Sequence, residues 1–221
     1  MRLRVDRTHL RTALFATALA FALPFSTEAL GQTVSQINLT TDNQDFLTSQ
    51  GFTPAANVDP NLINPWGMSY STTSPFWVSD QGTGVSTLYT GTGAPIPLVV
   101  TIPGSATGPS GPTGQVFNST SGFELAPGNP ARFIFANLSG TISGWNPTVN
   151  ATNAVIAATT EGAVYTGLAI GSSGGNSFIY AANNSAGTID VFDQNFNSRR
   201  SAGASTTRTC RQASHRLTPS T

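Results

Sequence analysis

The chain lacks lysine, and between Gln32 and Phe196 its sole basic residue is Arg132. Acids outnumber bases in this body, although the whole chain is formally neutral. An acidic body without a basic patch argues against nucleic acid as a partner, because phosphate binding depends on Lys and Arg. The acids of the body are Asp42, Asp45, Asp59, Asp80, Glu124, Glu161, Asp190 and Asp193.

Histidine and cysteine are also missing from this body. His9 precedes it, whereas His215 and the single cysteine, Cys210, follow it. The body as it stands therefore excludes a Ser-His-Asp triad, a Cys-His dyad and a His-ligated zinc or iron site. It also contains no phosphate-binding Gly-rich motif followed by Lys-Ser/Thr. Without a disulfide, the body must be held together by its core and by sheet pairing.

The first 31 residues have the three parts of a secretory signal peptide. Four arginines within the first eleven residues precede an apolar run from Thr12 to Phe25, and small residues end at Gly31. An uncleaved membrane anchor is the alternative, but a span needs about 20 apolar residues, and Pro24 breaks this run. We expect cleavage before Gln32 and a secreted, periplasmic or cell-surface protein without a transmembrane span.

The body repeats a strand, a Gly-containing turn and a second strand three times, at residues 76–89, 132–145 and 178–193. This pattern predicts three β-hairpins. A polar residue precedes each turn and a glycine ends it. The polar residues are Asp80, Asn137 and Asn183, and the glycines are Gly84, Gly140 and Gly187.

A further strand is expected before each hairpin, at residues 64–69, 122–126 and 166–170, and residues 104–114 form a Gly/Pro-rich insertion. The units recur every 45 to 57 residues, roughly. Several strands per unit at that spacing predict the blades of a β-propeller. No stretch shows the apolar period of a helix over ten residues, so the fold class predicted is all-β and propeller-like.

The third unit resembles an NHL-type propeller blade. More specifically, residues 33–196 resemble a bacterial family of secreted propellers with no assigned activity. This resemblance implies a six-bladed propeller, of which the chain would hold about three blades. The motifs that carry it are Asn64-Pro65-Trp66-Gly67, Gly111-Pro112-Thr113-Gly114-Gln115-Val116-Phe117-Asn118, Arg132-Phe133-Ile134-Phe135-Ala136, Gly167-Leu168-Ala169-Ile170, Ile179-Tyr180-Ala181-Ala182-Asn183 and Gly187-Thr188-Ile189-Asp190-Val191-Phe192-Asp193.

Residues 197–221 depart from this pattern. Half of the arginines fall in this segment and strand patterning stops. A solvated basic tail is one interpretation. A frameshift or truncation is the other, because permissible codons for residues 202–218, read two bases on, spell a string that resembles the family's continuation. We therefore expect domains at 1–31, 32–196 and 197–221, and open blade edges that favour self-association.

Few residues of the body suggest chemistry. Asp42 and Asp45, with Asn43, could offer oxygen ligands for calcium, but a polar loop near the mature N-terminus is the favoured interpretation. Asp80, Asn137 and Asn183 suit Asx turns, and Asp190 and Asp193 suit turn capping rather than catalysis. Trp66, Trp77 and Trp145 suit the core, with sugar stacking as the alternative.

These observations favour an exported, non-catalytic propeller that binds an unknown protein or carbohydrate. They assign no catalytic, cofactor-binding or metal-binding residue. One alternative is a metal-dependent propeller enzyme, a lactonase-like hydrolase or a lyase, whose catalytic residues lie in missing blades. Another is a non-functional, truncated gene product.

Overall fold

The computed structural model describes residues 35–106 and 110–199. The chain divides into two compact units, Met1–Gln36 and Ile37–Thr221, and every element below belongs to the second. The predicted signal peptide and the predicted tail beyond Arg199 lie outside the described residues. No helix within the described residues is long and apolar enough to cross a membrane.

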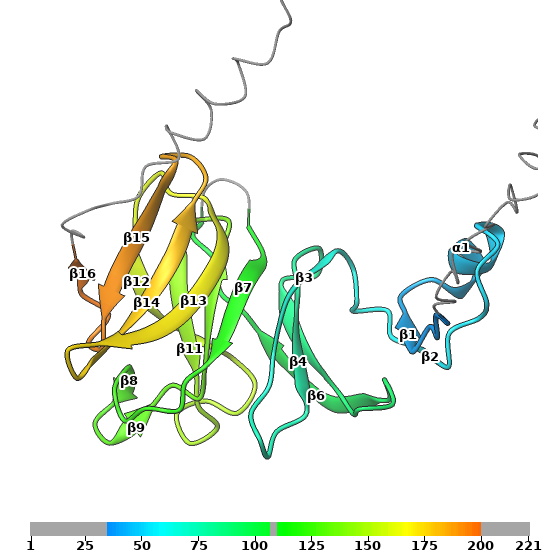
Figure 1. The fold of residues 1–221 in the computed structure, drawn as a ribbon, viewed down its shortest axis with the longest axis horizontal. Helices are drawn as coiled ribbons and strands as arrows, with labels where there is room; N and C mark the ends of the chain where they lie inside the picture. The colour runs from blue at the N-terminus through cyan, green and yellow to red at the C-terminus, as the bar shows by residue number, and fades with distance from the viewer. Residues whose placement is uncertain (1–34, 107–109, 200–221) are drawn as a thin grey trace, which may run out of the picture. The chain divides into compact units, whose positions relative to one another are not determined.

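Three four-stranded antiparallel sheets form the body, and we call them blades 1, 2 and 3 (Figure 1). Blade 1 contains β3 (Pro65–Ser69), β4 (Phe76–Asp80), β5 (Val85–Tyr89) and β6 (Pro95–Thr101). Blade 2 contains β7 (Pro112–Phe117), β10 (Phe133–Asn137), β11 (Thr141–Trp145) and β12 (Val155–Thr159). Blade 3 contains β13 (Tyr165–Ser173), β14 (Asn176–Asn183), β15 (Thr188–Asp193) and β16 (Ser198–Arg199).

In each blade the four strands lie in chain order across the sheet, although β8 and β9 come between β7 and β10 in the sequence. The three predicted hairpins are confirmed as β4–β5, β10–β11 and β14–β15. Repeated four-stranded meanders are the unit of a propeller. The all-β, propeller-like prediction is confirmed.

The strand predicted at residues 122–126 forms in part, but outside the sheet of blade 2. The first strand of that sheet is β7, at Pro112–Phe117. Residues Glu124–Ala126 form β8, which pairs with β9 (Asn129–Pro130) in a small separate sheet. Glycine and proline made the beginning of β7 look like a loop, but Pro112 stands at the first residue of the strand, where a missing N–H is tolerated.

Two smaller features complete the described part. Short β1 (Thr40–Thr41) pairs in parallel with β2 (Asn57–Val58), and α1 (Gln44–Ser49) lies between them in sequence. At the other end, β16 pairs with β15. Blade 3 therefore extends to Arg199, three residues past the expected boundary at Phe196.

The first strands of the three blades lie next to one another, with β7 contacting both β3 and β13 (Figure 1). Glycine permits this approach. A Cβ on Gly67 would lie 2.3 Å from the Thr113 carbonyl oxygen, and one on Gly114 would lie 2.2 Å from the Leu168 nitrogen. The Thr113 hydroxyl also donates to the Tyr165 carbonyl at 2.7 Å, which ties blade 2 to blade 3.

Strand β10 supplies both cores of the body, because successive side chains of a strand point to opposite faces. Phe133 and Phe135 enter a cluster with residues of blade 1, including Trp77. Ile134 and Ala136 enter a second cluster with residues of blade 3, including Ile179. Blade 2 is thus buried on both faces, and its contact with blade 1 is where the candidate site lies.

Candidate functional site

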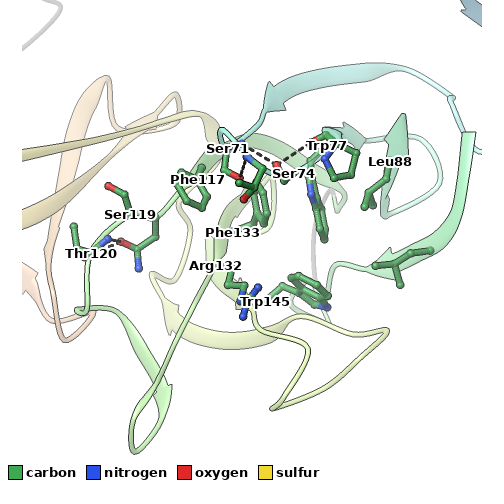
Figure 2. Close-up of a pocket in the computed structure, with 14 residues that line it drawn as sticks. Ser71, Ser74, Trp77, Leu88, Phe117, Ser119, Thr120, Arg132, Phe133 and Trp145 are labelled. Carbon is green, nitrogen blue, oxygen red and sulfur yellow. Dashed lines mark hydrogen bonds between the residues drawn. The ribbon is translucent and has the colours of Figure 1, made fainter. Parts of the chain in front are cut away.

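A pocket with a volume of about 510 Å³ lies where blade 1 meets blade 2 (Figure 2). Its floor is aromatic. The rings of Trp77 and Phe133 stack with centroids 4.3 Å apart, and the Trp145 ring lies 4.7 Å from that of Trp77. The residues that line it are Ser71, Thr73, Ser74, Pro75, Trp77, Leu88, Leu98, Phe117, Asn118, Ser119, Thr120, Arg132, Phe133 and Trp145.

Alternation along the strands builds this floor. In β4 the side chains of Trp77 and Ser79 are buried, whereas Phe76 and Val78, which alternate with them, are half-buried. Phe133 of β10, in blade 2, packs against Trp77 and completes the floor. Because both cores share β10, the floor is continuous with the packed interior and is preformed.

Arg132 is the one charged residue that lines the pocket. Its backbone is fixed, since its N–H donates to the Trp145 carbonyl at 2.7 Å and its carbonyl accepts from the Asn118 N–H at 2.9 Å. Its side chain is exposed. Among the described residues, the ion pair that forms is between Arg199 and Asp193, and the Arg132 guanidinium has no carboxylate partner.

The indole of Trp77 is buried without a hydrogen-bond partner. Trp77 is 2% exposed, and its Nε1, which solvent does not reach, has no partner among the described residues. The indole of Trp145, by contrast, donates to the Ala151 carbonyl at 3.2 Å. A buried donor without an acceptor is costly. The donor that the pocket presents to a ligand is therefore the exposed Arg132 guanidinium, which cannot accept hydrogen bonds.

The rim is held by its own hydrogen bonds. Asn118 donates through Nδ2 to the Ala131 carbonyl at 2.8 Å, and its Oδ1 accepts from the Thr120 N–H and hydroxyl. Ser74 Oγ accepts from the Ser71 N–H at 2.8 Å and donates to the Pro75 carbonyl. Of the hydroxyls that line the pocket, those of exposed Thr73 and Ser119 make no hydrogen bond among the described residues.

A separate polar chain is buried in blade 1. The Tyr89 hydroxyl donates to Asp59 Oδ2 at 2.8 Å. The Thr87 hydroxyl lies 2.9 Å from the Tyr89 hydroxyl and 2.6 Å from Asp80 Oδ2. Burial, with a smaller contribution from the negative charge of Asp59, raises the pKa of Asp80 to about 7 although the bond from Thr87 opposes it. None of these four residues lines the pocket.

The Asx-turn expectation is confirmed at two of its three positions. The Ser139 N–H donates to Asn137 Oδ1 at 3.0 Å, and the Ala186 N–H donates to Asn183 Oδ1 at 3.3 Å. The expectation is wrong for Asp80, whose carboxylate bonds to the Thr87 side chain. The reason is that Thr87 and Tyr89 face it from β5, where blade 2 has Ser143 and Trp145.

The predicted capping role holds for Asp193, whose Oδ1 accepts the backbone N–H groups of Asn195 and Asn197 at 2.9 Å each. Its burial acts to raise its pKa, but these bonds and Arg199 outweigh burial and lower the pKa. Asp190 instead accepts from side chains, the Tyr165 hydroxyl and Asn183 Nδ2.

The remaining candidates are scattered. Asn43 caps α1, since its Oδ1 accepts from the Phe46 N–H at 2.9 Å, and Asp42 and Asp45 are exposed nearby. Nowhere in residues 35–106 and 110–199 do three His, Cys, Asp or Glu side chains gather as a metal site would require. Trp77 and Trp145 are buried as expected, whereas Trp66 is 47% exposed.

Sequence reasoning missed the pocket itself. One signal was present, because the body's sole arginine directly precedes Phe133 in the repeated motif. The sequence did not reveal the pocket because the segments that form its sides are far apart in the chain. The loop that follows β3 and the turn that follows β7 meet only after blades 1 and 2 pack together.

Comparisons with known proteins give relatives without an assigned activity. Two uncharacterized proteins of Acanthamoeba polyphaga mimivirus are 34% and 30% identical to the chain over 160 and 166 residues. These alignments cover 69% and 72% of the chain but 41% and 40% of the viral proteins, so the chain spans about two fifths of their length. No protein-family model matches.

Among solved structures, virginiamycin B lyase from Staphylococcus aureus is similar with a TM-score of 0.44 and 13% identity. The match covers 61% of the chain and 40% of the lyase.

Proposed function

We propose that the chain is an exported, non-catalytic binding module that holds a small ligand in the pocket between blades 1 and 2. One observation carries this proposal: a 510 Å³ cavity is lined by apolar side chains and by the exposed Arg132, whose guanidinium has no carboxylate partner among the described residues. Binding pockets are concave, mostly apolar and supplied with a few polar groups, and they fall in this range of volume.

The lining of the pocket supports binding rather than catalysis. Its polar members are Ser, Thr and Asn side chains and one arginine, with no acid, histidine or cysteine among the described residues. A hydroxyl nucleophile requires a neighbouring general base. This pocket has none, but it does have a rigid floor and a rim fixed by internal hydrogen bonds.

Export is the second half of the proposal. It rests on the basic start, apolar run and small-residue exit of residues 1–31. The resemblance of residues 33–196 to secreted bacterial propellers supports the same compartment and an NHL-like ancestry. Since the viral relatives are much longer than their aligned part, any activity of a whole protein of this kind would add to the binding proposed here.

A fragment screen by differential scanning fluorimetry on the 221-residue chain tests the binding proposal. Exposed Ser119 at the rim would be replaced in Ser119→Trp, which fills the entrance without changing the core. Ser172→Trp is the matched control, because Ser172 is also exposed and lies on β13 away from the pocket.

The proposal predicts fragments that raise the melting temperature of the parent and of Ser172→Trp but not of Ser119→Trp. It fails if no fragment stabilises the parent, or if every stabilising fragment acts equally on Ser119→Trp.

A further inference from the structure

We infer that the pocket selects an organic anion, a carboxylate carried on a flat apolar body. This inference rests on the proposed function, because it names the class of ligand for the same pocket. It depends on three features of the lining: its charge, its unused hydrogen-bond donors and the composition of its floor.

The charge of the pocket is positive in a body that is otherwise acidic. Arg132 supplies it, and no Asp or Glu lines the pocket to neutralise it. Its guanidinium has no ion-pair partner among the described residues. A guanidinium presents its donors in a fork that matches a carboxylate, and such pairs are stronger than neutral hydrogen bonds.

The hydrogen-bond donors of the pocket also favour an anionic ligand. Figure 2 shows Arg132 among the residues that line the pocket. Its exposed guanidinium only donates hydrogen bonds and has no carboxylate partner among the described residues. A ligand that satisfies it must bring acceptors, and an anionic oxygen is the strongest acceptor available.

The floor favours an apolar body over a sugar. Trp77 and Trp145 are 2% and 6% exposed, so neither indole presents an open face on which a sugar could stack. The rim groups that would serve sugar hydroxyls, Asn118 and Thr120 among them, already bond to each other. Burial of apolar surface against half-buried Pro75, Leu98 and Phe117 is what remains to drive binding.

Isothermal titration calorimetry with two isosteric probes tests the inference on the full chain. The probes are 2-naphthoate, which is an anion at neutral pH, and 2-naphthamide, which is not. Arg132→Gln removes the charge of an exposed side chain, and Trp77→Phe removes the indole N–H but keeps a buried ring. Arg199→Gln is the control, because Arg199 is also exposed and pairs with Asp193 outside the pocket.

We expect naphthoate to bind the parent at least about tenfold more tightly than naphthamide, as a hydrogen-bonded charge pair predicts. Arg132→Gln should remove this preference, whereas Trp77→Phe, which keeps the charge, and Arg199→Gln should both retain it.

Equal binding of the two probes, or full naphthoate affinity in Arg132→Gln, would overturn the inference and leave the proposed function standing. Tighter binding of glucuronate than of naphthoate would overturn the apolar-body half in the same way. Binding of neither naphthalene probe would also overturn the inference, and the Ser119→Trp screen then decides separately whether the pocket binds anything.

Discussion

The ring of Trp77 in blade 1 stacks on the ring of Phe133 in blade 2, with an interplanar angle of 23°. This one contact belongs both to the core between the blades and to the floor of the pocket. The pocket is therefore as rigid as the packing of the two blades, and its shape does not depend on a loop closing over a ligand.

Phe133→Ala should lower the free energy of unfolding by about 3 to 5 kcal/mol, because it removes a buried ring from the seam between blades 1 and 2. Phe133 is 3% exposed. Urea unfolding followed by circular dichroism measures the change. Met68→Ala is the control, since Met68 is 62% exposed and should cost about 0.5 kcal/mol or less. Equal losses in the two variants would contradict the described packing.

Gly114→Ala should destabilise the chain by about 1 to 3 kcal/mol, because the added methyl group overpacks the approach of β7 to β13. Its Cβ would lie 2.2 Å from the Leu168 nitrogen, which is backbone and cannot turn aside. Gly171→Ala is a matched control, since there the nearest atom is a Tyr180 ring carbon at 3.6 Å. Thermal unfolding compares them, and a Gly114→Ala variant as stable as Gly171→Ala would show that the first strands are not in close contact.

The repeat could be predicted from the sequence because each hairpin carries its own local signals. Alternating apolar residues and a glycine after Asp80, Asn137 and Asn183 fix three turns and their registers. The first strand of blade 2 could not be predicted, because Pro112 is a residue type that is rare in strands and Gly114 serves the close approach of a neighbouring blade.

The pocket could not be predicted for a related reason. Arg132 and Trp77 are far apart in the chain, and only the packing of two blades places them around one cavity. The hydrogen bond of the Asp80 carboxylate could not be predicted either, because Thr87 reaches it only when β4 pairs with β5.

Asp80 should make stability fall as pH rises from about 4 to 7. Its pKa is about 7 in the folded chain, against an ordinary value of 3.8. Between these values the folded state keeps a proton that the unfolded state has lost, so each pH unit weakens folding by at most about 1.4 kcal/mol. Below the lower value and above the upper one, this contribution is flat.

Asp80→Asn should remove that decline and leave the variant more stable than the parent at pH 8. Asparagine already stands at the same place in the other blades, as Asn137 and Asn183. Urea unfolding at intervals from pH 4 to 8 measures the difference from the parent, with exposed Asp42→Asn as control. A constant difference between parent and Asp80→Asn across this range would contradict the raised pKa.

Asp193→Ala should cost more stability than Arg199→Gln. The alanine leaves the N–H groups of Asn195 and Asn197 without their acceptor, whereas Arg199 is 62% exposed and its ion pair is worth about 1 kcal/mol or less. Because the pKa of Asp193 is lowered, its contribution is present above the unfolded pKa and is lost as pH falls through the folded one. Acid titration of stability for both variants tests this, and an equal cost would contradict it.

A crystal structure of the full chain grown with 2-naphthoate tests the central claim most directly. We predict the naphthalene ring in the pocket between blades 1 and 2, with its carboxylate within about 3 Å of the Arg132 guanidinium. A ligand bound instead among the first strands of the blades, beside Trp66 and Leu168, or an empty pocket at saturating probe, would contradict it.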